Sequence, residues 1–297
     1  MKIVHPYVDL IQQEPGFDGI MKHIERCGRT CYKSEDKITD DSADTFVANL
    51  IKNKHYAMLE HGTVYLKIDC NESLDTSFNT NPYSIVKFVG NYLYITTNYR
   101  VLLENEWLDT LCFICEPTRY HVPRITLKFT TNIGVTREGN RMRANSIAEE
   151  STRYCNYSKD KYDKQLSICK PVWIDDQALE IYNELSVKGE FDYINASDDM
   201  KAIAVWYRHM YDCQCAYNNL ISLGWTPQQA REVLPLGTKS EVVYTAFPHQ
   251  WKHFFDLRLF GTTGKPHPNM QEIAELAQGV LEENNLWELI YPSNDKK

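Results

Sequence analysis

The apolar residues of this chain are spaced as in strands through the first half and as in helices through the second. Residues 63–69 and 125–130 alternate apolar with polar or amphipathic side chains, and residues 92–97 are rich in aromatic and β-branched types. Alternation with a period of two is typical of strands that bury one face. Helical spacing dominates after residue 170. Strands followed by helices favour an α+β fold, in which a mostly antiparallel sheet packs against long helices.

Capping residues mark the clearest of the expected helices. Ser197 can cap a long amphipathic helix that ends near Gly224. Thr226, followed by Pro227 and Gln229, is a helix start of the capping-box type. The same patterns predict helices at residues 42–54, at 251–260 and from about residue 268, and a strand at 242–247.

Size and charge set broad limits on the kind of protein. With 297 residues, of which 43% are hydrophobic and 24% charged, the chain is expected to form a single domain over residues 1–297, with residues 112–124 as a possible surface insertion. No apolar run approaches the roughly 20 residues that span a bilayer, and no secretory signal is visible, so a cytoplasmic location without membrane contact is expected. The net charge of -8 argues against a nucleic-acid partner, so an anionic ligand would need a local arginine cluster.

Nine cysteines invite a test for metal or redox motifs. Cys112 and Cys115 have a two-residue gap suited to zinc, and Cys213 and Cys215 could be imagined as their partners. The second gap is one residue, and Cys213 is expected on the buried face of a helix, where cysteine usually acts as a small apolar residue. The first pair lies in an apolar run. We therefore expect reduced thiols with structural roles and no metal site.

One short stretch, residues 138–154, combines arginines, serines and glutamates and holds few apolar side chains. Its polar members are Arg141, Arg143, Ser146, Glu149, Glu150, Ser151 and Arg153. Guanidiniums bind phosphate or carboxylate as rigid forks, and hydroxyls and carboxylates suit a sugar or a heterocycle edge. The stretch therefore resembles a nucleotide site. A solvated helix face is the alternative, because several of these residues stand four apart.

Several segments together resemble the flavin-dependent thymidylate synthases, the ThyX family. The family signature R-H-R-x-x-S is similar to Arg141-Met142-Arg143 followed by Ser146, and its Ser-x-Arg-Tyr ending is similar to residues 151–154. Residues 29–34, 59–61 and 229–235 look like further family segments in family order. Arg231 and Arg258 fit the two C-terminal arginines of the family. The resemblance runs from about residue 27 to residue 276.

The resemblance implies a ThyX-like fold and an enzyme that methylates dUMP to dTMP. Methylenetetrahydrofolate would supply the carbon, and FAD reduced by NADPH would supply the hydride. The family builds each site from several subunits, so a homotetramer with shared sites is implied. The small-molecule partners are then dUMP, the folate and NADPH.

Site residues carry over by position. Those implied to contact dUMP are Glu138, Arg141, Glu149, Glu150, Ser151, Arg153, Arg231 and Arg258. Those implied to contact FAD are His61, Thr63, Arg141, Met142, Arg143, Glu149, His249 and His253. Arg258 and Ser151 are the implied catalytic residues: a guanidinium at the N3/O4 edge of uracil stabilises negative charge that develops on the ring. Arg153 and Arg231 would hold the phosphate.

The chain also departs from the family pattern. Met142 replaces the signature histidine, Phe247 replaces an asparagine and His249 replaces an arginine, and all three changes fall on the flavin side. Flavin affinity could therefore be reduced. Taken without the family, His61 would be read as a structural histidine, and His249 and His253 as a chance pair or metal ligands.

Competing classes of function remain. A non-catalytic nucleotide- or flavin-binding homologue would need only the arginines. A thymidylate synthase with a cysteine nucleophile would need an activated cysteine near a histidine. No cysteine here is followed by histidine, and none lies between Arg141 and Arg153. A metal-dependent hydrolase is disfavoured because no H-E-x-x-H pattern is present.

Overall fold

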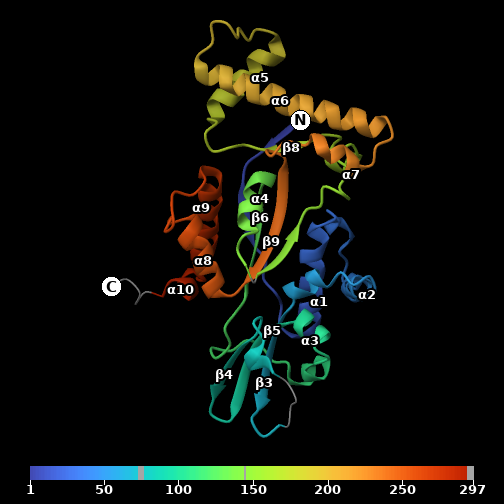
Figure 1. The fold of residues 1–297 in the computed structure, drawn as a ribbon, viewed down its shortest axis with the longest axis vertical. Helices are drawn as coiled ribbons and strands as arrows, with labels where there is room; N and C mark the ends of the chain where they lie inside the picture. Colours follow the sequence, from blue (N-terminus) through green and yellow to red (C-terminus); the bar gives the residue numbers. More distant parts are fainter. Residues whose placement is uncertain (73–76, 144, 293–297) are drawn as a thin grey trace.

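A four-stranded antiparallel sheet forms the centre of the molecule (Figure 1). The computed structural model describes residues 1–72, 77–143 and 145–292. In spatial order the strands of this sheet are β2 (Tyr7–Leu10), β6 (Ile125–Asn132), β9 (Lys239–Ala246) and β7 (Ser146–Glu149). The two long strands, β6 and β9, pair over their full length and carry the sheet. Together with the helices around it, this sheet confirms the expected α+β class.

One face of the sheet is apolar and is covered by the C-terminal helices. These are α8 (Pro248–Arg258), α9 (Pro268–Glu283) and the short α10 (Trp287–Ile290). The alternation in β6 turns Ile125, Leu127 and Phe129 toward them, and all three are buried. Trp251 is fully buried in the same cluster, and its indole nitrogen donates to the Ile125 carbonyl oxygen at 3.1 Å. Burial of these large side chains supplies the driving force that holds α8 on the sheet.

The opposite face of the sheet is mostly polar and meets the N-terminal helices. These are α1 (Gly16–Thr30) and the 3₁₀ helix η2 (Tyr56–His61), while α2 (Ser42–Lys52) packs against both of them. Here β6 presents Thr126 and Lys128, and β9 presents Glu241 and Thr245. The threonine hydroxyls lie 2.8 Å apart and are buried, so this interface is held by hydrogen bonds and ion pairs as well as apolar contacts.

A three-stranded antiparallel sheet forms the lower end of the molecule in Figure 1. Its order is β3 (Thr63–Asp69), β5 (Tyr92–Asn98) and β4 (Ile85–Val89), with α3 (Tyr99–Glu104) and the 3₁₀ helices η3 (Phe78–Thr80) and η4 (Leu108–Phe113) beside it. Val64, Leu66 and Leu102 pack in one buried cluster with residues of α1 and α2. Residues 112–124 run along this sheet, where Ile114 forms a bridge with Leu66. That segment as a surface insertion stays a prediction.

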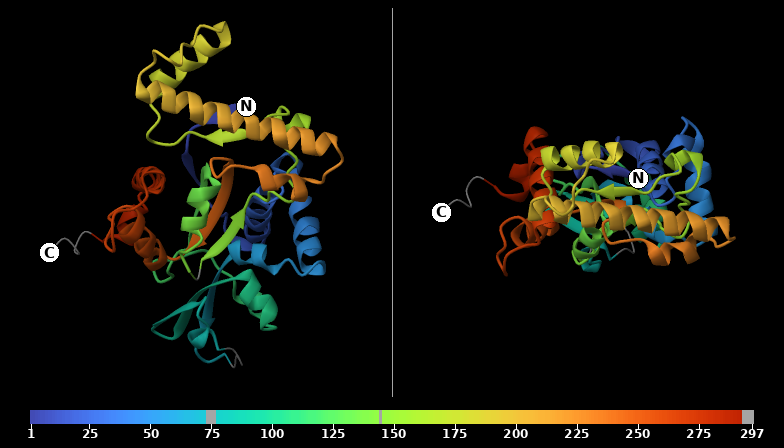
Figure 2. Two further views of the ribbon diagram at one scale, coloured as in Figure 1. Left: turned by 45° about the horizontal axis from the view of Figure 1, so that its top comes forward. Right: turned by 90° about the horizontal axis from the view of Figure 1, so that it is seen from above.

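The upper end combines the chain's N-terminus with its longest helix (Figure 2). Strand β1 (Lys2–Val4) pairs in parallel with β8 (Ser167–Cys169), and α5 (Asp176–Lys188) precedes α6 (Asp198–Ser222). The Ser197 side chain accepts from the Met200 amide and caps α6, as predicted. Thr226 and Gln229 form the predicted capping box of α7 (Pro227–Ala230). The remaining short elements are α4 (Ile133–Gly139) and the 3₁₀ helices η1 (Glu35–Lys37), η5 (Asp160–Tyr162) and η6 (Arg231–Val233).

The structure rules out one alternative and corrects one expectation about local structure. The arginine-rich stretch contains strand β7, so it is not a helix face, and pairing with β9 overrides its helix-like charge spacing. Cys213 is only half-buried, and its sulfur lies 3.7 Å from His209 Nε2, so it is not a core residue of α6.

The cysteines are free, and no disulfide links them. Within residues 1–72, 77–143 and 145–292, no cluster of histidine, cysteine, aspartate or glutamate could hold a metal ion. None of the helices in the described part of the chain combines the length and apolar character that crossing a bilayer requires.

Candidate active site

A cleft of about 540 Å³ opens between α4, the segment that follows β7, and η6. We call it the α4–η6 cleft. It is lined by Ile133, Arg137, Glu149, Glu150, Ser151, Thr152, Arg153, Arg231, Glu232, Leu234, Pro235, Leu236 and Ser240. Five of the predicted dUMP residues therefore meet in one place, although they come from segments some eighty residues apart along the chain.

Local structure places two of the guanidiniums of this cleft, those of Arg153 and Arg231. Strand β7 ends at Glu149, and a turn follows in which the Arg153 amide donates to the Ser151 hydroxyl at 3.3 Å. The capping box at Thr226 starts α7, which leads directly into η6 and Arg231. Arg153 Nη2 donates to Gln228 Oε1 at 3.4 Å and so connects the two segments. Both arginines keep free N–H groups that can donate hydrogen bonds to an anion.

Two of the three glutamates of the cleft, Glu149 and Glu150, have different environments. Glu149 accepts hydrogen bonds from Ser240 Oγ and Asn140 Nδ2, each at 3.1 Å. Glu150 accepts from Lys239 Nζ at 2.7 Å and from the Tyr157 hydroxyl at 3.3 Å, and its side chain is only 1% exposed. Burial raises the pKa of Glu150 despite its lysine partner. Its carboxylate is therefore engaged behind the cleft, and a ligand would meet its backbone.

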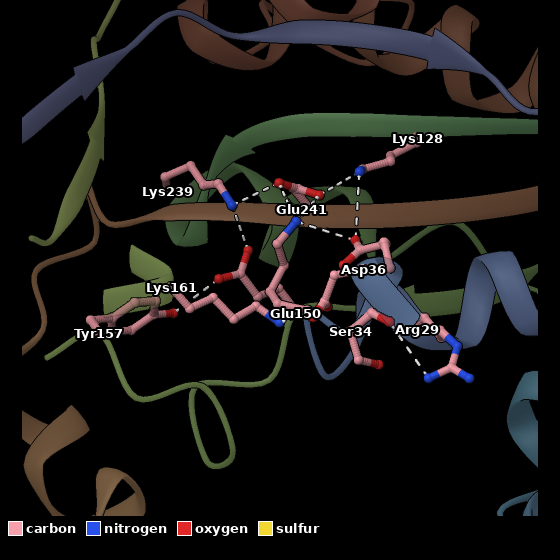
Figure 3. Close-up of polar contacts among 11 residues, drawn as sticks. Arg29, Ser34, Asp36, Lys128, Glu150, Tyr157, Lys161, Lys239 and Glu241 are labelled. Carbon is pink, nitrogen blue, oxygen red and sulfur yellow. Dashed lines mark hydrogen bonds and ion pairs between the residues drawn. The ribbon is translucent and has the colours of Figure 1, made fainter. Parts of the chain in front are cut away.

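A buried ion cluster supports the floor of the cleft from behind (Figure 3). Glu241 on β9 accepts from Lys33 and Lys239 at 2.9 and 2.8 Å and also pairs with Lys128. Lys239 in turn holds Glu150. The three lysines hold the pKa of Glu241 far below its ordinary value. The cluster thus fixes the end of β7, which leads into the lining residues Ser151 and Arg153, to β9 and to the loop after α1.

Arg258 and Glu138 meet each other but do not line the α4–η6 cleft. Arg258 is in the last turn of α8, and its Nη2 donates to the Glu138 backbone oxygen at 3.0 Å. The two side chains also form an ion pair at 3.5 Å. Glu138 faces a second cleft of about 330 Å³ on the other side of α4, shared with Trp173, Trp206 and other residues. Within one chain, Arg258 is thus separated from the phosphate-binding candidates.

Three of the predicted flavin residues are buried. His61 is fully buried, its Nδ1 lies 2.8 Å from Thr245 Oγ1, and burial lowers its pKa well below the ordinary value. Thr63 is buried at the start of β3. Met142 is buried in the apolar cluster beneath α8 and α9, because its thioether is apolar where the family signature has a polar ring.

Four of the other predicted flavin residues lie at the surface around one end of β7, and the half-buried Glu149 lies at the opposite end of the strand. Arg141 and Arg143 precede the strand, and His249 and His253 are on the first turns of α8; all four are exposed. Because Ser146 pairs with Thr245, residues just before β7 lie beside those that start α8. The His249 ring stacks on Phe247 with centroids 5.8 Å apart.

Two arginines in this region were missed from the sequence. Arg137 lines the α4–η6 cleft. Arg124 donates to the Glu60 carbonyl oxygen and to Ser146 Oγ, each at 2.7 Å, so it joins the signature strand to η2. Neither belongs to a motif. Helix α4, which carries Arg137, was not predicted either, so no sequence signal pointed to this residue.

A comparison with models of known protein families identifies the family of this chain. Residues 115–287, more than half of the chain, match the family model described as thymidylate synthase complementing protein. The chain belongs to this family. That membership confirms the family expected from the signature residues. The chain matches no curated protein.

Two solved structures are similar to the chain. One is described as the UMP/dUMP methylase PolB from Streptomyces cacaoi bound with 5-Br dUMP, with 16% identity, a TM-score of 0.47, and coverage of 98% of this chain and 97% of that one. The same enzyme bound with 5-Br UMP gives 14% identity, a TM-score of 0.46, and coverage of 97% and 95%.

Proposed function

We propose that this protein methylates dUMP to dTMP, with methylenetetrahydrofolate as carbon donor and FAD reduced by NADPH as hydride source. Membership of the thymidylate synthase complementing protein family supports the reaction class. The observation that carries the proposal is the α4–η6 cleft, which gathers Ser151, Arg153 and Arg231 from distant segments. Two guanidiniums beside a hydroxyl suit a nucleotide phosphate.

Arg258 is proposed to activate the pyrimidine. Negative charge that develops on the ring during attack at C6 would be stabilised by a guanidinium in a partly buried site. Arg258 is about one-fifth exposed and is oriented by Glu138. Since this pair lies outside the α4–η6 cleft of its own chain, we propose that it reaches a nucleotide held by a neighbouring subunit of a homotetramer. Ser151 would help to seat the nucleotide.

The four exposed residues around the start of β7 fit a flavin dinucleotide. Within the described residues, the side chains of Arg141, Arg143, His249 and His253 have no hydrogen bond or ion pair, so they are available to the diphosphate of FAD. The flavin, when bound, would supply the hydride. Glu149, which is half-buried, is proposed to contact both ligands.

The buried residues fit the flavin less well. His61, Thr63 and Met142 have little or no exposed surface in this structure, so a direct flavin contact from them would require the surrounding segments to open. Their proposed roles therefore differ from those of the four exposed residues. Where the family has polar groups, Phe247 is buried and the exposed His249 ring stacks on it.

The test is an assay of purified protein loaded with FAD. NADPH oxidation is measured with and without dUMP, and dTMP formation is measured with methylenetetrahydrofolate. We expect a yellow protein, oxidation that depends on dUMP, and dTMP as product. Arg231→Gln should raise the KM for dUMP strongly, whereas Arg208→Gln, on the exposed face of α6, should not. A protein that binds both ligands yet forms no dTMP would be the non-catalytic homologue.

A further inference from the structure

Arg137 stands on the α4 wall of the α4–η6 cleft. Ile133 and Arg137 are one helical turn apart and both line this cleft, whereas Gly134 and Glu138 line the second cleft. Residues four apart share a helix face, so α4 separates the two cavities and turns Arg137 toward the first. The segments that carry Arg153 and Arg231 form other walls of the same cleft.

The Arg137 side chain has no partner within the described residues. It is exposed, and no carboxylate there lies within ion-pair distance of it. The other two guanidiniums are only weakly engaged: Arg153 donates to a neutral glutamine at 3.4 Å, and the nearest carboxylate oxygen to Arg231 is 3.9 Å from its Nε. Three guanidiniums therefore surround the cleft with most of their N–H groups free.

The carboxylates of the cleft do not cancel this charge. Glu150 is bound to Lys239 behind the floor, and Glu149 already accepts from Ser240 and Asn140. Glu232 is the one exposed carboxylate beside Arg231 within the described lining. The cleft thus favours an anion with several acceptor oxygens, and a phosphate monoester, with three acceptor oxygens and a charge near -2, matches three guanidiniums.

We propose that Arg137 is a third phosphate-binding residue, which acts with Arg153 and Arg231 and makes the cleft select a nucleoside monophosphate over the nucleoside. The identity of the nucleotide as dUMP rests on the proposed function. The phosphate-binding role of Arg137 rests on the cleft alone. The guanidinium of Arg137 on α4 would bind the phosphate from a different wall of the cleft than Arg153 and Arg231 do.

A purely structural role makes a different prediction. Arg137 is in the last turn of α4, where a positive charge stabilises the helix C-terminus. In that case its removal would lower stability and would not discriminate between ligands that carry a phosphate and ligands that do not.

The experiment compares Arg137→Gln and Arg137→Lys with a matched control. Arg26→Gln removes an exposed arginine from α1, outside the lining of the cleft. Binding of dUMP, deoxyuridine and inorganic phosphate is measured by calorimetry, and thermal unfolding is recorded for each variant. We expect Arg137→Gln to weaken dUMP and phosphate about 10- to 100-fold, the loss of one charge-assisted contact, and to leave deoxyuridine unchanged. Arg137→Lys should lose less, and the control nothing.

Each outcome decides the matter. Equal dUMP affinity in Arg137→Gln and Arg26→Gln, equal losses for dUMP and deoxyuridine, or no binding of dUMP and phosphate to the unmodified protein would overturn the inference. If the unmodified protein forms no dTMP but binds phosphate or dUMP through Arg137, the proposed function fails and this inference stands. If Arg137→Gln forms dTMP with the KM of the wild type, the proposed function stands and the phosphate-binding role of Arg137 fails.

Discussion

Replacing Glu241 by glutamine should destabilise the protein more than any surface charge change. The Glu241 side chain is 6% exposed, and its three lysine partners are 14–19% exposed. Removing one member of a buried ion pair typically costs about 3–5 kcal/mol. Lys33 and Lys239 keep Glu35 and Glu150 as partners, so we expect the lower end, about 3 kcal/mol. Lys128 keeps only a contact at 3.9 Å with Glu35.

The same substitution should change how stability depends on pH. The pKa of Glu241 is held far below its ordinary value of 4.5, so the unfolded chain takes up the proton first. The contribution of Glu241 is therefore complete above the ordinary value and is lost as the pH falls toward the folded-state pKa. Glu150, whose pKa is raised first by burial and also by the charge of Glu241, contributes with the opposite sign, and the Glu241 part of that contribution is lost in the variant.

Urea unfolding at pH 7 and at pH 4 measures both effects. The difference between wild type and Glu241→Gln should be large at pH 7 and smaller at pH 4. Glu184→Gln is the matched control, because Glu184 forms an exposed pair with Lys188 at 4.0 Å, and such pairs contribute little. If the two substitutions shift the urea midpoint equally, the ion cluster does not stabilise the fold as argued.

Three further outcomes are expected. Arg258→Ala should abolish dTMP formation with little effect on flavin absorbance, and unchanged turnover would refute its role. Gly139→Ala should cost about 1–3 kcal/mol in urea unfolding, because its Cβ would lie 2.5 Å from the Tyr244 hydroxyl oxygen; an unchanged midpoint would contradict this close approach. Calorimetric affinity for dUMP should fall below about pH 6, where the phosphate gains its second proton while the guanidiniums stay charged, and a flat profile to pH 5 would argue against phosphate recognition.

Local signals in the sequence predicted the elements that carry their own patterns. The alternation of apolar and polar residues predicted the bounds of β3 correctly, and the Ser197 side chain caps α6 as expected. At the start of α7 the Gln229 side chain accepts from the Thr226 amide, as in a capping box. Helix α1 was missed, because Pro15 precedes it without a side-chain cap. Strand β7 was missed because its four residues become a strand only by pairing with β9, far along the chain.

The site residues also fall into those that the sequence predicted and those that depend on distant contacts. Arg153 and Arg231 could be predicted because each lies in a recognisable motif, and the fold brings them to one cleft. The partner of Glu150 could not be predicted, since Lys239 is 89 positions away and nothing local marks the pair. The burial of His61 was equally hidden, because it depends on the hydroxyl of Thr245 across the sheet interface.

The strand order of the central sheet has a consequence for synthesis on the ribosome. Strand β2 (Tyr7–Leu10) pairs only with β6, and β6 needs β9 (Lys239–Ala246) on its other side. Strand β2 can pair once β6 has emerged, but the other edge of β6 must stay unpaired until β9, near the end of the chain, has been translated. At roughly 5–20 residues per second this interval is on the order of ten seconds, long enough for a chaperone to hold the nascent chain.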